Sequence, residues 1–247
     1  MKLMFIGSGD AFGSGGRLQT CFHVDTGEDA FLIDCGASAM IGLNRFGIDP
    51  NTISTIYISH LHGDHFSGLV WFLMHAYYVS KRTEPLTIAG PQGIEERYRA
   101  ATEVLFPGSS GIKRKHDVTF VEYGIEQPTR IGPATLTGYE VSHPSGSMSC
   151  ALRLEVGEKI LSYSGDTQWV DNLIPCAEGA DLFIAECYGY DKPVPYHTNW
   201  ATLSANLPRL GAKRVLITHM NNDMLARQEE ARAAGVLLAE DGLVVDI

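Results

Sequence analysis

The chain has 247 residues, 45% of them hydrophobic, which is enough to bury a sizeable core, and its even composition predicts a single domain over residues 1–247. Lys and Arg total 19 against 29 Asp and Glu, so the formal net charge is −10 at pH 7, which disfavours a broad nucleic-acid-binding surface. No apolar run is long enough to span a membrane, no signal-peptide core is evident, and five cysteines without a CxxC pair indicate reduced thiols, so we expect a cytoplasmic protein with no membrane partner.

Short apolar and β-branched runs, bounded by turn residues, predict eleven strands. They lie at residues 3–6, 31–33, 55–59, 86–89, 118–123, 134–141, 151–156, 160–163, 182–185, 215–218 and 243–247. Apolar residues at spacings of three and four predict helices between them, at residues 66–77, 93–105, 169–176, 198–210 and 223–238. We therefore expect a mixed α/β sandwich in which helices cover two packed sheets.

Two segments of the chain share a pattern. Residues 56–65 and 215–224 each hold an apolar strand that ends in Ser or Thr and then His, with an Asp four residues after that His. This repetition predicts two related halves, with His60 and His219 at equivalent strand ends. Coincidence between two buried strands is the alternative interpretation.

The most informative stretch is the motif HxHxDH at residues 60–65, in which His60, His62, Asp64 and His65 are candidate metal ligands. The first two histidines stand two residues apart where a strand ends, so both imidazoles can project to one side. We expect Gly63 to let the backbone turn tightly and bring the other two ligands round. Imidazole and carboxylate donors without thiolate favour zinc, with manganese or iron as alternatives. The apolar strand before the motif and the apolar helix after it disfavour a merely solvated histidine loop.

Three more candidate ligands stand where a predicted strand gives way to a loop. His143 follows the strand at 134–141, Asp166 follows the strand at 160–163, and His219 ends the strand at 215–218. Any one of them alone would more often be a loop residue or a satisfied core histidine. As a set they repeat the context of the first motif, so we expect them to complete the metal site.

The order of these motifs resembles the metallo-β-lactamase superfamily over nearly the whole chain. Leu-Ile-Asp-Cys-Gly at residues 32–36 looks like the early strand-loop signature of that family, and Tyr-Ser-Gly-Asp-Thr at residues 163–167 is similar to its ribonuclease Z-like branch. The resemblance implies an α/β fold of the αββα type, a four-layer sandwich of two packed mixed β-sheets with outer helices. It also implies two divalent metal ions, one held by His60, His62 and His143, the other by Asp64, His65 and His219, with Asp166 as the bridge. Asp34 would orient a ligand histidine, unless it only forms a turn.

Such a centre implies hydrolysis. A pair of metals can hold a bridging hydroxide and stabilise both the attacking and the leaving oxygen, and Asp64 beside the hydroxide could accept its proton. His197 lies where the ribonuclease Z-like branch carries an H-[ST]-T-like motif, which implies that it contacts the phosphate or protonates the leaving group. The alternative is that His197 merely adjoins a helix start. Arg17, in the glycine-rich loop after the first strand, aligns only loosely with a phosphate-contacting stretch of that branch.

The chain departs from the tRNA-processing members of that branch. No long Gly/Pro-rich arm is inserted between His143 and Asp166 or between Asp166 and His197. The only basic cluster, at residues 113–116, is read as a solvated loop in which His116 is exposed. Together with the net charge of −10, this makes tRNA an unlikely partner. We therefore expect a phosphodiesterase that acts on a small-molecule substrate, namely a small or cyclic phosphodiester.

Two other functions stay open at this point. The same metals would support hydrolysis of a lactone, thioester or β-lactam. A non-catalytic metal-binding scaffold or accessory protein is the second alternative, although the presence of all seven candidate ligands argues against it. The family resemblance also makes a homodimer plausible.

Overall fold

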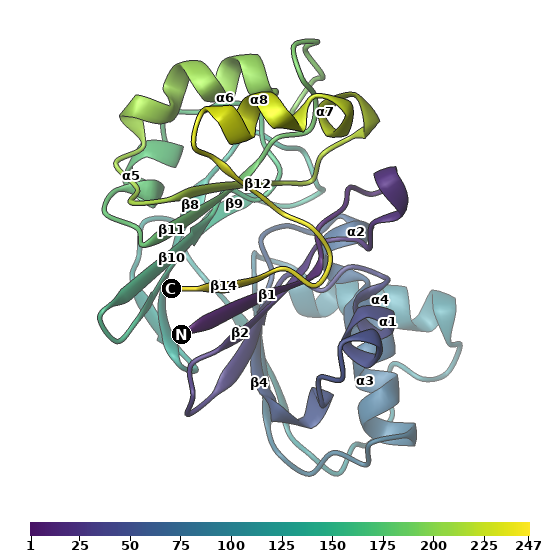
Figure 1. Ribbon diagram of the computed structural model, residues 1–247. Coiled ribbons are helices and arrows are strands. Elements are labelled where there is room, and N and C mark those ends of the chain that lie inside the picture. The colour runs from purple at the N-terminus through teal and green to yellow at the C-terminus, as the bar shows by residue number, and fades with distance from the viewer.

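Two seven-stranded mixed sheets pack face to face in the computed structural model, which describes residues 1–247 (Figure 1). The first sheet has the order β14 (Val244–Asp246), β1 (Lys2–Gly7), β2 (Cys21–Asp25), β3 (Ala30–Ile33), β4 (Ile53–Tyr57), β5 (Leu86–Gly90), β6 (Val118–Glu122). The second has the order β13 (Leu237–Leu238), β12 (Val215–Thr218), β11 (Leu182–Glu186), β10 (Lys159–Tyr163), β9 (Cys150–Val156), β8 (Ala134–Glu140), β7 (Thr129–Ile131).

Helices cover the outer face of each sheet, so the expected αββα layers are confirmed (Figure 1). The first sheet carries α1 (Ala39–Arg45), α2 (Gly63–Phe66), α3 (Gly68–Tyr78) and α4 (Ile94–Leu105). The second carries α5 (Leu173–Ala177), α6 (Trp200–Asn206), α7 (Asn222–Ala226) and α8 (Gln228–Ala233). Short 3₁₀ turns occupy η1 (Ser14–Gly16), η2 (Pro50–Thr52) and η3 (Leu207–Arg209). None of these helices has the length and apolar character that crossing a bilayer requires.

The main core lies between the two sheets. Alternate residues of each strand point into it, as the two-residue period of a β-strand dictates. Phe22 of the first sheet meets Tyr163 of the second edge to face, with ring centroids 5.1 Å apart. Leu161, also from the second sheet, is fully buried in the same cluster. This apolar layer holds the two sheets in register, and so it fixes the strand ends that carry the candidate ligands.

The two sheets repeat one pairing pattern. Read from β14 in the first sheet and from β7 in the second, each sheet has three antiparallel strand pairs followed by three parallel pairs. In this order β3 corresponds to β10, β4 to β11, and β5 to β12. His60 follows β4 and His219 follows β12, so these histidines do not end equivalent strands and that detail of the prediction is wrong. The matched pair is instead β3 and β10, which are followed by Asp34 and by the loop of Asp166.

The predicted elements differ from the structure mainly where elements are short. The strands β2, β7 and β13 and the helix α1 were not predicted, and of these β7 and β13 have only three and two residues. The single helix predicted at 223–238 is two helices, which part at Arg227 with φ of −122°, and then β13, since Gly235 with φ of 81° ends α8 in a Schellman motif. The predicted exposure of His116 is also wrong, since only 6% of this residue is accessible. The five cysteines are all buried and unpaired, as expected of reduced thiols.

The core between the sheets gives a direct stability test. We expect Leu161→Ala to lower the free energy of unfolding by about 2–5 kcal/mol, because the site is closed on all sides and cannot collapse fully. Val104→Ala, at a position 80% exposed on α4, is the control and should change it by less than about 0.5 kcal/mol. Urea unfolding measures both variants, and equal losses would contradict the placement of Leu161.

Candidate metal centre

The HxHxDH motif spans the end of β4 and the short helix α2. His60 and His62 lie in the extended segment after β4, and α2 begins at Gly63 and carries Asp64 and His65. Gly63 is not in the left-handed region, and a Cβ there would meet only ordinary contacts. The expectation that the turn requires a glycine at this position is therefore wrong. The motif is thus shaped by the switch from strand to helix.

Glycine is required instead where α2 and α3 approach the loop after β3. A Cβ on Gly36 would lie 2.3 Å from the carbonyl oxygen of Asp64, and one on Gly68 would lie 2.1 Å from the carbonyl oxygen of Gly36. The backbones then interlock, since Cys35 donates to the carbonyl of His65 and Gly68 donates to the carbonyl of Cys35. This close approach gives the Leu-Ile-Asp-Cys-Gly stretch a physical role, which is to hold Asp34 against the motif.

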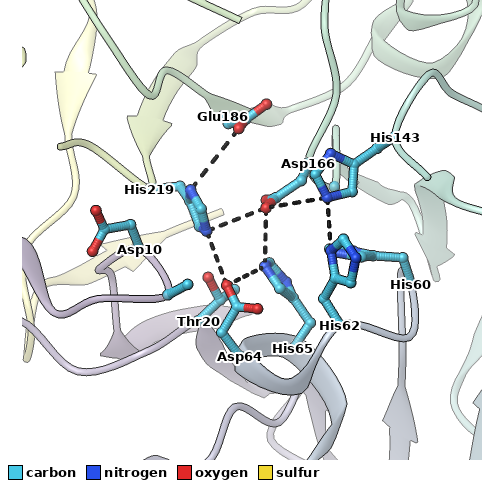
Figure 2. Close-up of polar contacts among 12 residues, drawn as sticks. Asp10, Thr20, His60, His62, Asp64, His65, His143, Asp166, Glu186 and His219 are labelled. Carbon is cyan, nitrogen blue, oxygen red and sulfur yellow. Dashed lines mark hydrogen bonds and ion pairs between the residues drawn. The ribbon is translucent and has the colours of Figure 1, made fainter. Parts of the chain in front are cut away.

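Three histidines form the first group of candidate ligands. His60, His62 and His143 each offer a ring nitrogen within 4.8 Å of the others. The closest approach is 2.9 Å, from His143 Nε2 to His62 Nδ1. His143 is carried by the loop after β8, in the other sheet, so the group spans the two halves of the fold (Figure 2).

Two carboxylates and two imidazoles form the second group, made of Asp64, His65, Asp166 and His219. His65 Nε2 lies 3.2 Å from Asp64 Oδ2 and 3.3 Å from Asp166 Oδ2. His219 Nε2 lies 3.3 Å from the same two oxygens. Figure 2 shows the Asp166 carboxylate between His219 on one side and His143 on the other, and His143 Nε2 is 3.9 Å from Asp166 Oδ2. Asp166 therefore stands where the two groups meet.

Partners outside the cluster orient the candidate ligand histidines. Asp34 Oδ2 lies 2.6 Å from His65 Nδ1, and the same carboxylate accepts from the backbone and hydroxyl of Ser59. The hydroxyl of Ser59 lies 3.1 Å from His60 Nδ1. His143 Nδ1 lies 3.0 Å from the carbonyl oxygen of Tyr196. The backbone of Tyr196, with φ of 65°, is in the left-handed region. In each case the outward nitrogen is engaged, which leaves Nε2 to face the cluster, as metal-binding histidines usually do.

The charge states differ within the cluster. Burial lowers the pKa of His60 well below its usual value, so this ring is neutral. Burial alone would raise the pKa of Asp166, but the neighbouring His219 and His65 outweigh it and hold that pKa well below its usual range. Burial would lower the pKa of His65 and His219, but the neighbouring carboxylates raise that of His65 well above its usual value and that of His219 to about 9, so both rings must release a proton when metal binds.

Buried polar atoms without hydrogen-bond partners also favour a metal ion at this site. His60 Nε2, His65 Nε2 and Asp166 Oδ1 are buried and make no hydrogen bond within the protein. Leaving such groups unsatisfied is costly, and most buried polar atoms have a partner. A set of imidazole and carboxylate donors converging without thiolate fits a zinc-type ion or its manganese or iron equivalents.

Glu186 is a site residue that the sequence reasoning missed. It ends β11, is 1% exposed, and its carboxylate contacts His197 Nδ1 and accepts from the backbone of Thr167 at 2.7 Å. Burial would lower the pKa of His197, but this carboxylate raises it. Glu186, His197, Asp166 and His219 form a third group of mutually close donors. A carboxylate at the end of a central parallel strand was the available signal, because the candidate ligands also follow strand ends.

Other candidates lie elsewhere. The guanidinium of Arg17 donates to the carbonyl of Ala239 at 2.7 Å and lines a separate groove with Arg214 and Arg232, so the structure does not bring it into the cluster. The cavity of about 660 Å³ on the helical face is apolar, lined by residues such as Trp71 and Phe106, and contains no member of the cluster. Cavity size therefore does not locate this site; the convergence of titratable groups does.

The family is decided by sequence comparison. A sequence model of the family described as "Anti-Pycsar protein Apyc1" matches residues 1–241. The chain belongs to this family. The Apyc1-family chain is also 26% identical over 267 aligned residues to ribonuclease Z of Methanothermobacter thermautotrophicus, covering 90% of this chain and 87% of that protein. It is 27% identical over 228 residues to the probable metallo-hydrolase YhfI of Bacillus subtilis, covering 89% and 87%.

Solved structures support the fold. The Apyc1-family chain superimposes on the metallo-β-lactamase fold protein YhfI from Bacillus subtilis with a TM-score of 0.79 and 23% identity, covering 99% of both chains. The short form of human tRNase Z gives the same TM-score and identity, covering 100% of this chain and 99% of that one. The predicted metallo-β-lactamase fold and ribonuclease Z-like branch are thereby confirmed. The protein is a metal-dependent hydrolase of this branch.

The Asp34 contacts give a test of how the site is supported. We expect Asp34→Ala to lower the free energy of unfolding by about 3 kcal/mol, because it removes the acceptor of Ser59 and the partner of His65 inside a closed site. Asp34→Asn should cost less, since Asn tolerates the left-handed φ of 56° and keeps one acceptor oxygen. Chemical unfolding of both variants measures the two losses of unfolding free energy, and Asp25→Asn, at an exposed position, is the control. Equal stability of all three variants would contradict the expected order.

Proposed function

We propose that this protein is a binuclear metal-dependent phosphodiesterase acting on a small or cyclic phosphodiester. One observation carries the proposal: two groups of buried donors meet at the Asp166 carboxylate, and His197 lies beside them with its Nδ1 in contact with the Glu186 carboxylate. Paired metal sites that share a carboxylate serve displacements at ester and phosphoryl centres. The relatives named ribonuclease Z and metallo-hydrolase agree with this class of reaction.

The ligands divide between two divalent ions, zinc first and manganese or iron as alternatives. In our assignment His60, His62 and His143 would hold one ion, Asp64, His65 and His219 would hold the other, and Asp166 would contribute to both. When bound, the ions would polarise the phosphoryl oxygens and supply a nucleophilic water near neutral pH. Asp64, ionised between His65 and His219, accepts the proton of the attacking water.

His197 protonates the leaving group. Its Nδ1 is engaged by Glu186, which leaves Nε2 as the nitrogen available for proton transfer. The ring is stacked on Tyr188 with centroids 4.7 Å apart, and its side chain is 20% exposed, so it is held in place and still accessible to a substrate. Glu186 is a positioning residue in this scheme, because it fixes the orientation and tautomer of His197.

A small substrate fits the charge of the chain better than tRNA. Relatives named ribonuclease Z match along most of their length, so RNA cleavage is the natural comparison. The net charge of −10 opposes the phosphate contacts that hold a polyanion. A precursor tRNA incubated with the enzyme should therefore be cleaved far more slowly than a small cyclic diester at the same concentration.

The metal centre can be tested by removal and return. We expect turnover of bis(4-nitrophenyl) phosphate to be lost on treatment with a chelator and restored by zinc or manganese. Asp64→Ala should lower kcat by about a hundredfold or more, because it loses both a metal ligand and a proton acceptor. Absorbance of released nitrophenol gives the rates, and wild-type turnover no higher than that of Asp64→Ala would sink the proposal.

The role of His197 can be separated from that of the metals by the leaving group. We expect His197→Ala to lower kcat by about 10²–10⁴-fold for diesters with alkoxide leaving groups, which need a proton. The nitrophenyl diester, whose leaving group needs none, should lose much less. Glu186→Gln, which keeps the shape of the side chain, should show the same dependence on the leaving group in a weaker form.

The same variants discriminate the competing reactions. If lactones or thioesters are the true substrates, His197→Ala should impair them as strongly as it impairs diesters, and wild-type enzyme should prefer them. If the protein is a metal-binding scaffold, no diester, lactone or thioester will be turned over above the Asp64→Ala background. A homodimer and a cytoplasmic location stay predictions, and sedimentation of the purified protein tests the first.

A further inference from the structure

A second cavity, of about 320 Å³, has a basic lining. It lies against the C-terminal end of α3, and its polar walls come from the loop before β5 and the loop before β6. The residues concerned are Tyr77, Tyr78, Lys81, Arg82, Lys115 and His116. We refer to it as the basic pocket.

The basic pocket is separate from the metal centre. Strands β4, β5 and β6 are parallel, and His60 follows the C-terminal end of β4. Arg82 and His116 precede β5 and β6, so they lie at the N-terminal end of the same strands. No residue of the metal centre lines the pocket. A ligand bound here is therefore not a substrate in the act of hydrolysis.

The charge of the pocket is opposite to that of the chain. The whole sequence has ten more acidic than basic residues (29 − 19), yet three Lys or Arg side chains and no carboxylate line this cavity. Lys81 and Lys115 are exposed and make no ion pair, although Glu84 and Asp117 are close along the chain. Unpaired cations gathered around a concave site attract an anion.

Arg82 supplies a fixed charge at the wall. It is 3% exposed, and its guanidinium donates to four backbone carbonyls, at distances of 2.7–3.0 Å. These acceptors are neutral, and the carboxylates of Glu84 and Asp49 act on the charge from nearby but form no ion pair with it. The backbone at Lys81, with φ of 53°, is in the left-handed region, a conformation uncommon for a long side chain. This turn places Lys81 beside the pocket.

His116 is the feature that points to a ligand. It is 94% buried (6% exposed), it lines the pocket, and neither of its ring nitrogens makes a hydrogen bond of good geometry. Burial and the nearby guanidinium of Arg82 lower its pKa, while the carbonyl of Arg82 partly opposes them. The carbonyl of Arg82 is thus an acceptor of poor geometry, and an anion seated against the ring would supply a better one.

We propose that the basic pocket binds the phosphate group of a small molecule, with Lys81, Lys115 and His116 as its contacts. The volume is at the lower end of the range for small-molecule sites, which suits inorganic phosphate or a phosphomonoester. The rings of Tyr77 and Tyr78 line the same cavity and offer a stacking surface for the organic part of a phosphomonoester. The proposal is independent of the function assigned to the metal centre.

The test follows His116 itself, because phosphate could also bind at the metals. In the zinc-loaded protein, the imidazole resonances are recorded by NMR, assigned with His116→Gln, and followed during addition of inorganic phosphate at constant ionic strength. We expect a saturable shift of the His116 signals toward the protonated form. Lys81→Gln with Lys115→Gln should weaken the binding by about tenfold or more, since charge-assisted contacts are lost.

Lys113→Gln is the matched control, because Lys113 belongs to the same basic run and is exposed but does not line the pocket. It should leave the dissociation constant unchanged. A parallel titration with adenosine monophosphate distinguishes the two sources of phosphate. If adenosine monophosphate binds more tightly than inorganic phosphate and Tyr78→Ala removes the difference, the natural ligand is a nucleotide. If the two bind equally, the pocket recognises the phosphate group alone. No saturable shift of His116, or the same weakening by Lys113→Gln as by the double variant, would overturn the proposal.

Discussion

The arrangement of this site depends on one buried carboxylate, that of Asp166. It is 2% exposed, its Oδ2 lies 3.3 Å from both His65 and His219, and the same oxygen is 3.9 Å from His143. A buried charge of this kind is costly unless opposite charges surround it, and without an ion His65 and His219, whose pKa values are raised, supply them; a bound metal would take the place of their protons. The two donor groups are joined through this residue, which is why we assign it as the bridge.

The fold brings these groups together through the ends of its strands. The HxHxDH motif follows β4 in one sheet, while Asp166 and His219 follow β10 and β12 in the other. The core between the sheets holds both sets of strand ends at one edge, where the chain can turn and expose polar side chains. Interlocked glycines at positions 36 and 68 then bring the loop of Asp34 against the motif. Support of the ligands is therefore built into the same contacts that pack the fold.

Much of the site could be predicted because its residues follow apolar strands in a pattern that is rare by chance. The motif at residues 60–65 and the three later ligands are local features, and the structure places all seven together. Glu186 escaped prediction because one carboxylate at the end of a buried strand is not distinctive until its partner His197, eleven residues later, lies beside it. His116 was misjudged for a similar reason: its burial depends on a loop more than thirty residues earlier in the chain, near Arg82. Short strands such as β13 carry too few residues for a period to show.

The central claim is that two ions share Asp166, and anomalous diffraction tests it most directly. Crystals of the zinc-loaded protein, measured on both sides of the zinc absorption edge, should show two anomalous peaks about 3.5–4 Å apart. We predict one peak beside His60, His62 and His143 and the other beside Asp64, His65 and His219, with the Asp166 carboxylate between them. A single peak, or peaks away from these side chains, would contradict the account.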